Sequence, residues 1–212
     1  MKGIFAVYKP KGPTSHDIIN KLRRETGVRK IGHAGTLDPL ASGVLVVGVG
    51  REATKQLGAI VKKEKEYLAK IRLGMTSTTD DEEGTKTEVR IVGKIPTLGE
   101  IKKAVAKFKG EILQTPPIYS AIKVKGKEAY KLARQGQAPE LKPRKALIKE
   151  IETLKYEWPY LEINVVTGPG VYIRALARDL GKELKVGGYL AELERTRVGE
   201  FTRGLTSTLR RG

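Results

Sequence analysis

One carboxylate stands out in the sequence because of its surroundings. Asp38 lies in the stretch GHAGTLDPLASGVLVVGVG, residues 32–50, among glycines and directly before a long apolar run. Glycines let a backbone approach a ligand closely, and a buried strand is a rigid mount for a functional side chain. A turn-forming role is the alternative, because Asp before Pro favours extended geometry and bonds nearby amides. We expect Asp38 to be a functional carboxylate.

Several kinds of site that an aspartate can serve are not indicated. Neither GxGxxG nor GxxxxGK[ST] occurs, which argues against a glycine-rich nucleotide loop. Only His16 and His33, and no cysteine, accompany Asp38, so we expect no metal site. A glycoside or phosphate-ester hydrolase would usually bring a second carboxylate or a metal set, and neither motif is present. The carboxylate is therefore expected to act alone on an organic substrate.

The composition indicates a polyanionic partner. The 212-residue chain has 41 Lys and Arg against 24 Asp and Glu, a formal net charge of +17. Such a charge concentrates nucleic acid and speeds its encounter, although scattered surface lysines are the plainer explanation. The chain has no cysteine, and no apolar run approaches the roughly 20 residues of a membrane span. Since MKGIFAVYKP does not read as a signal peptide, we expect a cytoplasmic protein that binds no membrane.

The elements that must position Asp38 alternate between strands and helices. Apolar patterning predicts strands at residues 3–8, 43–50, 66–74, 88–92, 146–154, 161–167 and 190–201. Helical periodicity predicts helices at residues 16–26, 52–60, 101–109 and 172–184. Ser15 is the expected N-cap of the first helix and Gly27 its stop, and Thr97 with Glu100 forms a capping box for the third. The mixture predicts an α+β fold whose central sheet is mixed or mostly antiparallel and flanked by helices.

A basic segment rich in Pro, Gly and Lys interrupts this pattern between Gln114 and Pro143. We interpret it as an insertion arm on the main fold and not as a second core. The whole chain, residues 1–212, is then expected to form a single domain with no separate C-terminal domain.

Six ordered segments resemble the signature segments of the TruB-type tRNA pseudouridine-55 synthases, in their bacterial branch. They extend from about Lys2 to Thr202 and read KPKGPTS, GHAGTLDPLASGVL, KEYLAKIRLG, PPIYSAIKVKGKEAYKLARQG, GVYIRALARDLG and LERTRVGEF. The resemblance implies the pseudouridine synthase fold and a cofactor-free isomerisation of uridine to pseudouridine in the T loop of tRNA. Because the target base lies inside a folded loop, that reaction requires base flipping.

The resemblance also implies roles for individual residues. Asp38 matches the catalytic aspartate, and Arg174 matches an active-site arginine that would keep the carboxylate ionised by pairing with it. Tyr67 matches a tyrosine that stacks on the base and helps to remove the C5 proton. Tyr172 matches a further active-site aromatic, and His33 a histidine near the flipped base. On the bare sequence each has a plainer reading: a solvated arginine, packed tyrosines and a histidine satisfied within a turn.

Basic residues would bind the RNA. Lys9 and Lys11 lie in the KPKGPTS loop, which in the family supports the catalytic loop. The insertion arm resembles a mobile thumb that closes on the T loop, and its basic residues are Lys123, Lys125, Lys127, Lys131 and Arg134. Phosphate contacts give affinity but no base readout, so specificity is expected to come mostly from the shape of the RNA loop.

Two features depart from the family pattern. Pro169 and Val171 stand where relatives more often have a small or basic residue and a threonine. The chain stops soon after LERTRVGEF, where relatives usually continue into a PUA-like segment, so we expect a catalytic domain alone, as a monomer. A non-catalytic RNA-binding or RNA-chaperone protein is the alternative: it would share the charge and the arm but have no use for Asp38 paired with Arg174.

Overall fold

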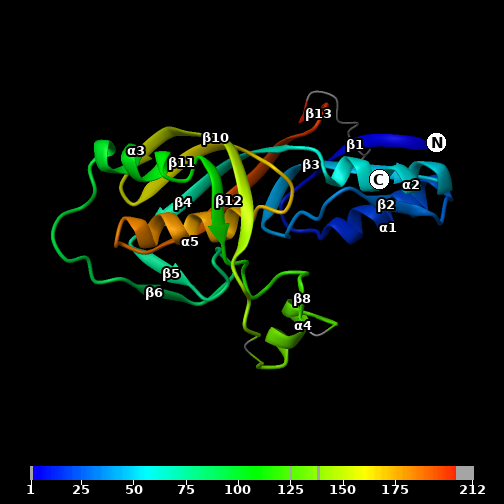
Figure 1. The fold of residues 1–212 in the computed structure, drawn as a ribbon. Coiled ribbons are helices and arrows are strands. Elements are labelled where there is room, and N and C mark those ends of the chain that lie inside the picture. Colours follow the sequence, from blue (N-terminus) through cyan, green and yellow to red (C-terminus); the bar gives the residue numbers. More distant parts are fainter. Residues whose placement is uncertain (1, 125, 138, 204–212) are drawn as a thin grey trace. The chain divides into compact units, whose positions relative to one another are not determined.

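The computed structural model describes residues 2–124, 126–137 and 139–203, and within them the chain forms two compact units (Figure 1). Unit 1 holds the residues up to 68, residues 165–169 and those from 192 onward, and unit 2 holds residues 69–164 and 170–191. The expectation of a single domain stays a prediction.

Unit 1 carries Asp38. Its helices are α1 (Ser15–Thr26) and α2 (Arg51–Val61), and its strands are β1 (Gly3–Lys9), β2 (Ile31–His33), β3 (Ala41–Val49) and β13 (Phe201–Thr202), with parts of β4 (Lys65–Leu73), β11 (Tyr160–Thr167) and β12 (Gly188–Val198). Both β1 and β2 pair antiparallel with β3, and β13 pairs antiparallel with β12. The pairing of β12 with β3 is parallel, which makes the sheet mixed.

The apolar run after Asp38 becomes β3, a strand that is buried on both faces. Leu45, Val47 and Val49 pack with the apolar face of α1, while Val44 and Val46 pack with residues of α2. A strand covered by helices on both sides reads as a continuous apolar run and not as an alternating one. The strand predicted from residues 43–50 is thus confirmed, and it is the rigid support expected behind Asp38.

The start of α1 differs by one residue from the expectation. Thr14 is the N-cap, and it forms a capping box with Asp17, so the assignment of Ser15 as the cap is wrong. The physical reason is that the Ser15 hydroxyl bonds the backbone of Leu37 and is not turned to the helix amides. Gly27 ends the helix in the left-handed region at φ 70°, as predicted.

Unit 2 carries Arg174 and the insertion arm. Its helices are α3 (Leu98–Ala106), α4 (Ala129–Arg134) and α5 (Ile173–Glu183), and its other strands are β5 (Met75–Ser77), β6 (Lys86–Glu88), β7 (Gly110–Gln114), β8 (Lys123–Val124), β9 (Lys127–Glu128) and β10 (Arg144–Glu157). The main strands follow the order β4, β11, β10, β7, and β5 and β6 form a separate two-stranded sheet. The Thr97–Glu100 capping box of α3 is confirmed.

Two strand predictions need correction. The strand expected at residues 88–92 is absent: β6 ends at Glu88, and Val92, with 91% exposure, has no sheet to pack on. The strand expected at residues 190–201 is β12 followed by β13, because Gly199 turns the chain at φ 54°.

In the part of the arm that the structure describes, β8 and β9 form a hairpin next to α4. None of the helices among the described residues is both long and apolar enough to span a membrane.

Candidate active site

Asp38 lies in a turn whose backbone is hydrogen-bonded to residues of the KPKGPTS loop. The Ser15 hydroxyl donates to the Leu37 carbonyl and accepts from the Leu37 amide, each at 2.8 Å. The Gly12 amide donates to the Pro39 carbonyl at 2.8 Å, and the Ala41 amide donates to that of Asp38 at 3.0 Å. The residues on both sides of the aspartate are therefore fixed by named hydrogen bonds, as a preorganised carboxylate requires.

Lys9 is a buried part of this support. Its side chain is fully buried, and Nζ donates to the carbonyls of Pro10 at 3.0 Å, Pro13 at 2.8 Å and Pro39 at 3.4 Å. The ammonium therefore links its own loop to the residue after Asp38, in keeping with a loop that supports the catalytic one. A direct contact of Lys9 with RNA stays a prediction. Lys11, in the same loop, is exposed.

Arg195, on β12, also binds this turn, and the sequence predicted no role for it. Its guanidinium donates from Nε to the Val44 carbonyl at 2.8 Å, from Nη2 to that of Gly35 at 3.1 Å and from Nη1 to that of Thr36 at 3.4 Å. Only 1% of Arg195 is exposed. Two signals in the sequence could have identified Arg195. It lies in LERTR, one of the segments that resemble the family, and the two-residue period of a strand places its side chain on the same face as Ala191 and Leu193.

Tyr67 lies on β4 and shares the surroundings of Arg195 and Asp38. Burial raises the pKa of the Tyr67 hydroxyl, the charge of Arg195 and its hydrogen bond to that hydroxyl lower it, and the charge of Asp38 raises it. The net pKa lies above the ordinary value, so the phenol is neutral at neutral pH. Tyr67 therefore stands within the electrostatic reach of both, while its roles in stacking and in removal of the C5 proton stay predictions.

His33 ends β2, a few residues before Asp38. Burial lowers the pKa of its imidazole, and the positive charges of Arg195 and His16 lower it further, against a smaller opposing effect from the Gly35 backbone. A neutral ring can stack on a base or accept a hydrogen bond without bringing a charge into the site. The contact of His33 with the flipped base stays a prediction.

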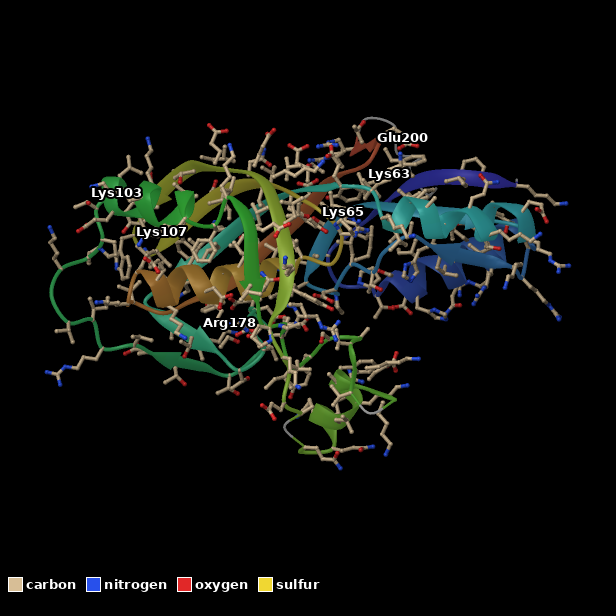
Figure 2. All side chains as sticks on the ribbon, in the orientation of Figure 1. Lys63, Lys65, Lys103, Lys107, Arg178 and Glu200 are labelled. Carbon is tan, nitrogen blue, oxygen red and sulfur yellow. The ribbon has the colours of Figure 1, made fainter. Side chains whose placement is uncertain are left out.

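Lys65 is a third buried cation, after Lys9 and Arg195, and lies at the start of β4 (Figure 2). Its ammonium donates to the carbonyls of Val61 at 2.8 Å and Lys63 at 2.7 Å, at the end of α2. Burial, with a smaller effect from the Arg195 charge, lowers its pKa to about 8. Lys65 thus closes the C-terminus of α2, where a cation is favoured.

In unit 2, Arg174 is buried in the first turn of α5 and does not project freely into solvent. It forms an ion pair with Asp81 at 3.3 Å, and it donates to the carbonyls of Thr79 at 3.2 Å and Tyr119 at 2.8 Å. Asp81 accepts from the Thr79 hydroxyl at 2.5 Å and from the Glu83 amide at 3.0 Å. The surface reading of Arg174 is therefore wrong. Its pairing with Asp38, which lies in the other unit, stays a prediction.

A second ion pair supports the same part of α5. Arg178, labelled in Figure 2, pairs with Asp80 at 2.8 Å and donates to the Thr115 carbonyl at 2.8 Å. Burial raises the pKa of Asp80, and the Arg178 charge opposes that rise. From the sequence, the segment that contains Asp80 and Asp81 was predicted only as a polar loop. Its ion pairs with two arginines one helical turn apart on α5 could not be predicted, because the partners are distant in the sequence.

Tyr172 precedes α5 and is fixed by its backbone. Its amide donates to Gln114 Oε1 at 2.8 Å, and Gln114 Nε2 donates to its carbonyl at 3.1 Å. Pro169 and Val171, the departures from the family pattern, flank this short connection. Tyr172 is half-buried, so its position beside a flipped base stays a prediction.

The insertion arm presents exposed positive charge. Lys123, Lys127, Lys131 and Arg134 are all exposed, whereas Lys125 lies outside the described residues. The guanidinium of Arg134 and the ammonium of Lys131 lie 5.6 and 5.7 Å from the centre of the Tyr130 ring. Basic groups around an aromatic face are typical of surfaces that bind RNA backbone and bases. Among the residues that the structure describes, no group of three or more His, Asp or Glu side chains could hold a metal ion.

A mixed sheet flanked by helices, together with an aspartate held on a tethered turn, is the architecture of the pseudouridine synthases, which are isomerases. Residues 23–173 match the family model described as TruB family pseudouridylate synthase (N terminal domain). The chain belongs to this family.

Individual relatives agree with that assignment. The tRNA pseudouridine synthase B of Mycobacterium sp. (strain KMS) is 51% identical over 203 residues, which are 94% of this chain and 68% of that protein. The protein of the same name from Thermobifida fusca (strain YX) is 45% identical over 98% of this chain and 73% of its own length.

A solved structure is similar over nearly the whole chain. In the crystal structure of a Cbf5-Nop10-Gar1 complex, one chain matches with a TM-score of 0.75 and 32% identity, covering 98% of this chain and 52% of that one. The present chain therefore spans about half the length of that solved chain.

Proposed function

We propose that the protein isomerises uridine to pseudouridine in tRNA, at position 55 of the T loop, with Asp38 as the nucleophile. The observation that carries the proposal is the tethered turn: hydrogen bonds from two sides fix the backbone around a single carboxylate, next to Arg195 and the buried Tyr67. Membership of the family and the identity to tRNA pseudouridine synthase B proteins support tRNA as the substrate.

The chemistry explains why one aspartate suffices. The reaction breaks the C1′–N1 bond and forms a C1′–C5 bond, and the proton lost from C5 is balanced by one gained at N1. No atom or electron is gained overall, so no cofactor or metal is required. An ionised carboxylate can add to an electron-poor carbon, either C6 of the base or C1′ of the ribose, and leave again once the base has turned.

Access to the uridine requires base flipping, because the target lies within a folded loop. Extrusion costs a few kcal/mol, which stacking on an aromatic face can offset by about 1–3 kcal/mol per base. Tyr67, Tyr172 and His33 are the candidates for that contact. Tyr67 is best suited, because the charges of Asp38 and Arg195 both affect the pKa of its hydroxyl.

Binding of the T arm would rest on charge. The net charge of +17 and the exposed basic residues of the insertion arm suit contacts with phosphates. Shape-selective recognition of the loop would then supply specificity, because phosphate contacts carry no sequence information.

Release of tritium tests the proposal. A tRNA transcript carrying [5-³H]uridine is incubated with the protein, since every turnover must expel the proton at C5. We expect release that approaches one equivalent per tRNA. Tight tRNA binding with no tritium release would instead support the alternative, a non-catalytic RNA-binding or RNA-chaperone protein.

A further inference from the structure

Arg195 is a fully charged side chain in the interior of unit 1. It is among the largest fully buried side chains of the described residues, and the guanidinium is protonated at any pH relevant to the protein. Replacing a buried charge by an apolar residue of similar volume often leaves a protein as stable or more stable. Packing alone is therefore a weak reason for an arginine at this position.

The hydrogen bonds of Arg195 go to both ends of the turn that carries Asp38. Two accepting carbonyls, those of Gly35 and Thr36, come before the aspartate, and the third, that of Val44, comes after it. The rigid, forked guanidinium thus joins the two ends of the turn. The bonds of Ser15 go to a different residue of the turn, Leu37.

The backbone of β3 is adapted to bring β12 this close. Gly43 lies opposite Arg195 in the parallel pairing and has φ 113°. A Cβ atom at residue 43 would collide with the backbone of Arg195, so only glycine fits there. The close approach sets the distance from which the guanidinium reaches the turn.

The charge of Arg195 also acts on Tyr67, a candidate for contact with the base. The charge of Arg195 lowers the pKa of the Tyr67 hydroxyl, against the larger opposite effect of burial, and the charge of Asp38 raises the pKa of the Arg195 guanidinium. One side chain therefore binds the support of the nucleophile and influences the tyrosine electrostatically.

We propose that Arg195 is a positioning residue for the isomerisation: it fixes both ends of the Asp38 turn. This inference rests on the proposed function. Removal of the fork should allow the carboxylate to move while leaving the RNA-binding surface intact. A misplacement of about 1 Å can cost about 100-fold in rate.

The test compares Arg195→Lys and Arg195→Gln with a matched control, Arg197→Lys. Arg197 lies two residues along the same strand, and its named contacts are with Glu64, Glu66 and the Gly199 carbonyl, none of which belongs to the Asp38 turn. For each protein, circular dichroism establishes the folded fraction, and filter binding gives the Kd for tRNA. The single-turnover rate of tritium release is then measured on folded protein.

We expect Arg195→Gln to lose about 100-fold in single-turnover rate, and Arg195→Lys, which keeps the charge but not the fork, to lose about 10-fold. The Kd should stay within about threefold, and Arg197→Lys should retain the wild-type rate. A wild-type rate in Arg195→Lys and Arg195→Gln, or failure of both to fold, would overturn the inference and leave Arg195 a residue of stability. A wild type that binds tRNA but releases no tritium would instead contradict the proposed function.

Discussion

The bond pair between Ser15 and Leu37 gives the sharpest prediction about the support of Asp38. Ser15→Ala removes one hydroxyl that both donates to the Leu37 carbonyl and accepts from its amide. Ser15 is 2% exposed and Leu37 3% exposed, so water does not readily replace either bond. The change leaves a buried donor and a buried acceptor without partners, on the residue directly before Asp38.

The magnitude follows from the cost of those two groups. An unsatisfied buried polar group costs about 1–3 kcal/mol, so we expect a loss of about 2–4 kcal/mol in the free energy of unfolding after partial relaxation. For a chain of this length that corresponds to a fall of about 5–15 °C in Tm. Because the released residue precedes the nucleophile, the single-turnover rate of the folded variant should also fall, by about 10- to 100-fold.

The adjacent threonine supplies the control. Thr14→Ala removes the capping box of α1 at an exposed position, which costs about 1 kcal/mol, but leaves the bonds to Leu37 in place. Thermal unfolding followed by circular dichroism and tritium release at 20 °C below the lower Tm separate the two effects. A Ser15→Ala variant that turns over like Thr14→Ala would refute the idea that this tether positions Asp38.

Further outcomes follow from other parts of the structure. Arg174→Lys should lower the rate by about 100-fold, because an ammonium cannot replace the planar contacts to Asp81, Thr79 and Tyr119; unchanged single-turnover kinetics would contradict this. The pKa of Lys65 is about 8 in the folded protein against an ordinary value of 10.5, so the unfolded chain binds more protons between these pH values. From pH 8 to pH 10.5, the free energy of unfolding of the wild type should therefore rise by about 1–3 kcal/mol relative to that of Lys65→Met. Urea denaturation at each pH measures both proteins, and the same pH dependence in the two would contradict a lowered pKa of Lys65. An isolated T-arm hairpin should be modified nearly as well as full-length tRNA, with log–log salt slopes of binding that agree to within about one phosphate. A slope steeper by about two phosphates for the full tRNA would reveal contacts outside the T arm.

Local patterns in the sequence predicted the elements around the site well. The alternation of Tyr67, Ala69, Ile71 and Leu73 gave the buried face of β4, and the apolar run after Asp38 gave β3. These features depend on the two-residue period of a strand and on burial, and both can be inferred from the pattern of apolar residues within one short segment. The same holds for the capping box at Thr97, whose partner is three residues away.

Contacts between distant residues could not be predicted in this way. Ser15 looks like an N-cap in isolation, and its bond to Leu37 across 22 positions exists only because the loop folds over the Asp38 turn. Arg195 is separated from Gly35 by 160 positions. Nothing local distinguishes a buried arginine that bonds three carbonyls from a surface one, apart from its place on an apolar strand face.

The central claim, that Asp38 converts a T-loop uridine, is tested most directly by mapping the product. Unmodified tRNA transcript is incubated with wild type or with Asp38→Asn, and pseudouridine is located by chemical labelling and primer extension. We expect a single stop that reports position 55 with the wild type and none with Asp38→Asn, while the two proteins bind the tRNA with Kd values within a few fold, because phosphate contacts dominate affinity. Pseudouridine formed at a wild-type rate by Asp38→Asn, or wild-type modification elsewhere in the tRNA but not at position 55, would contradict the account.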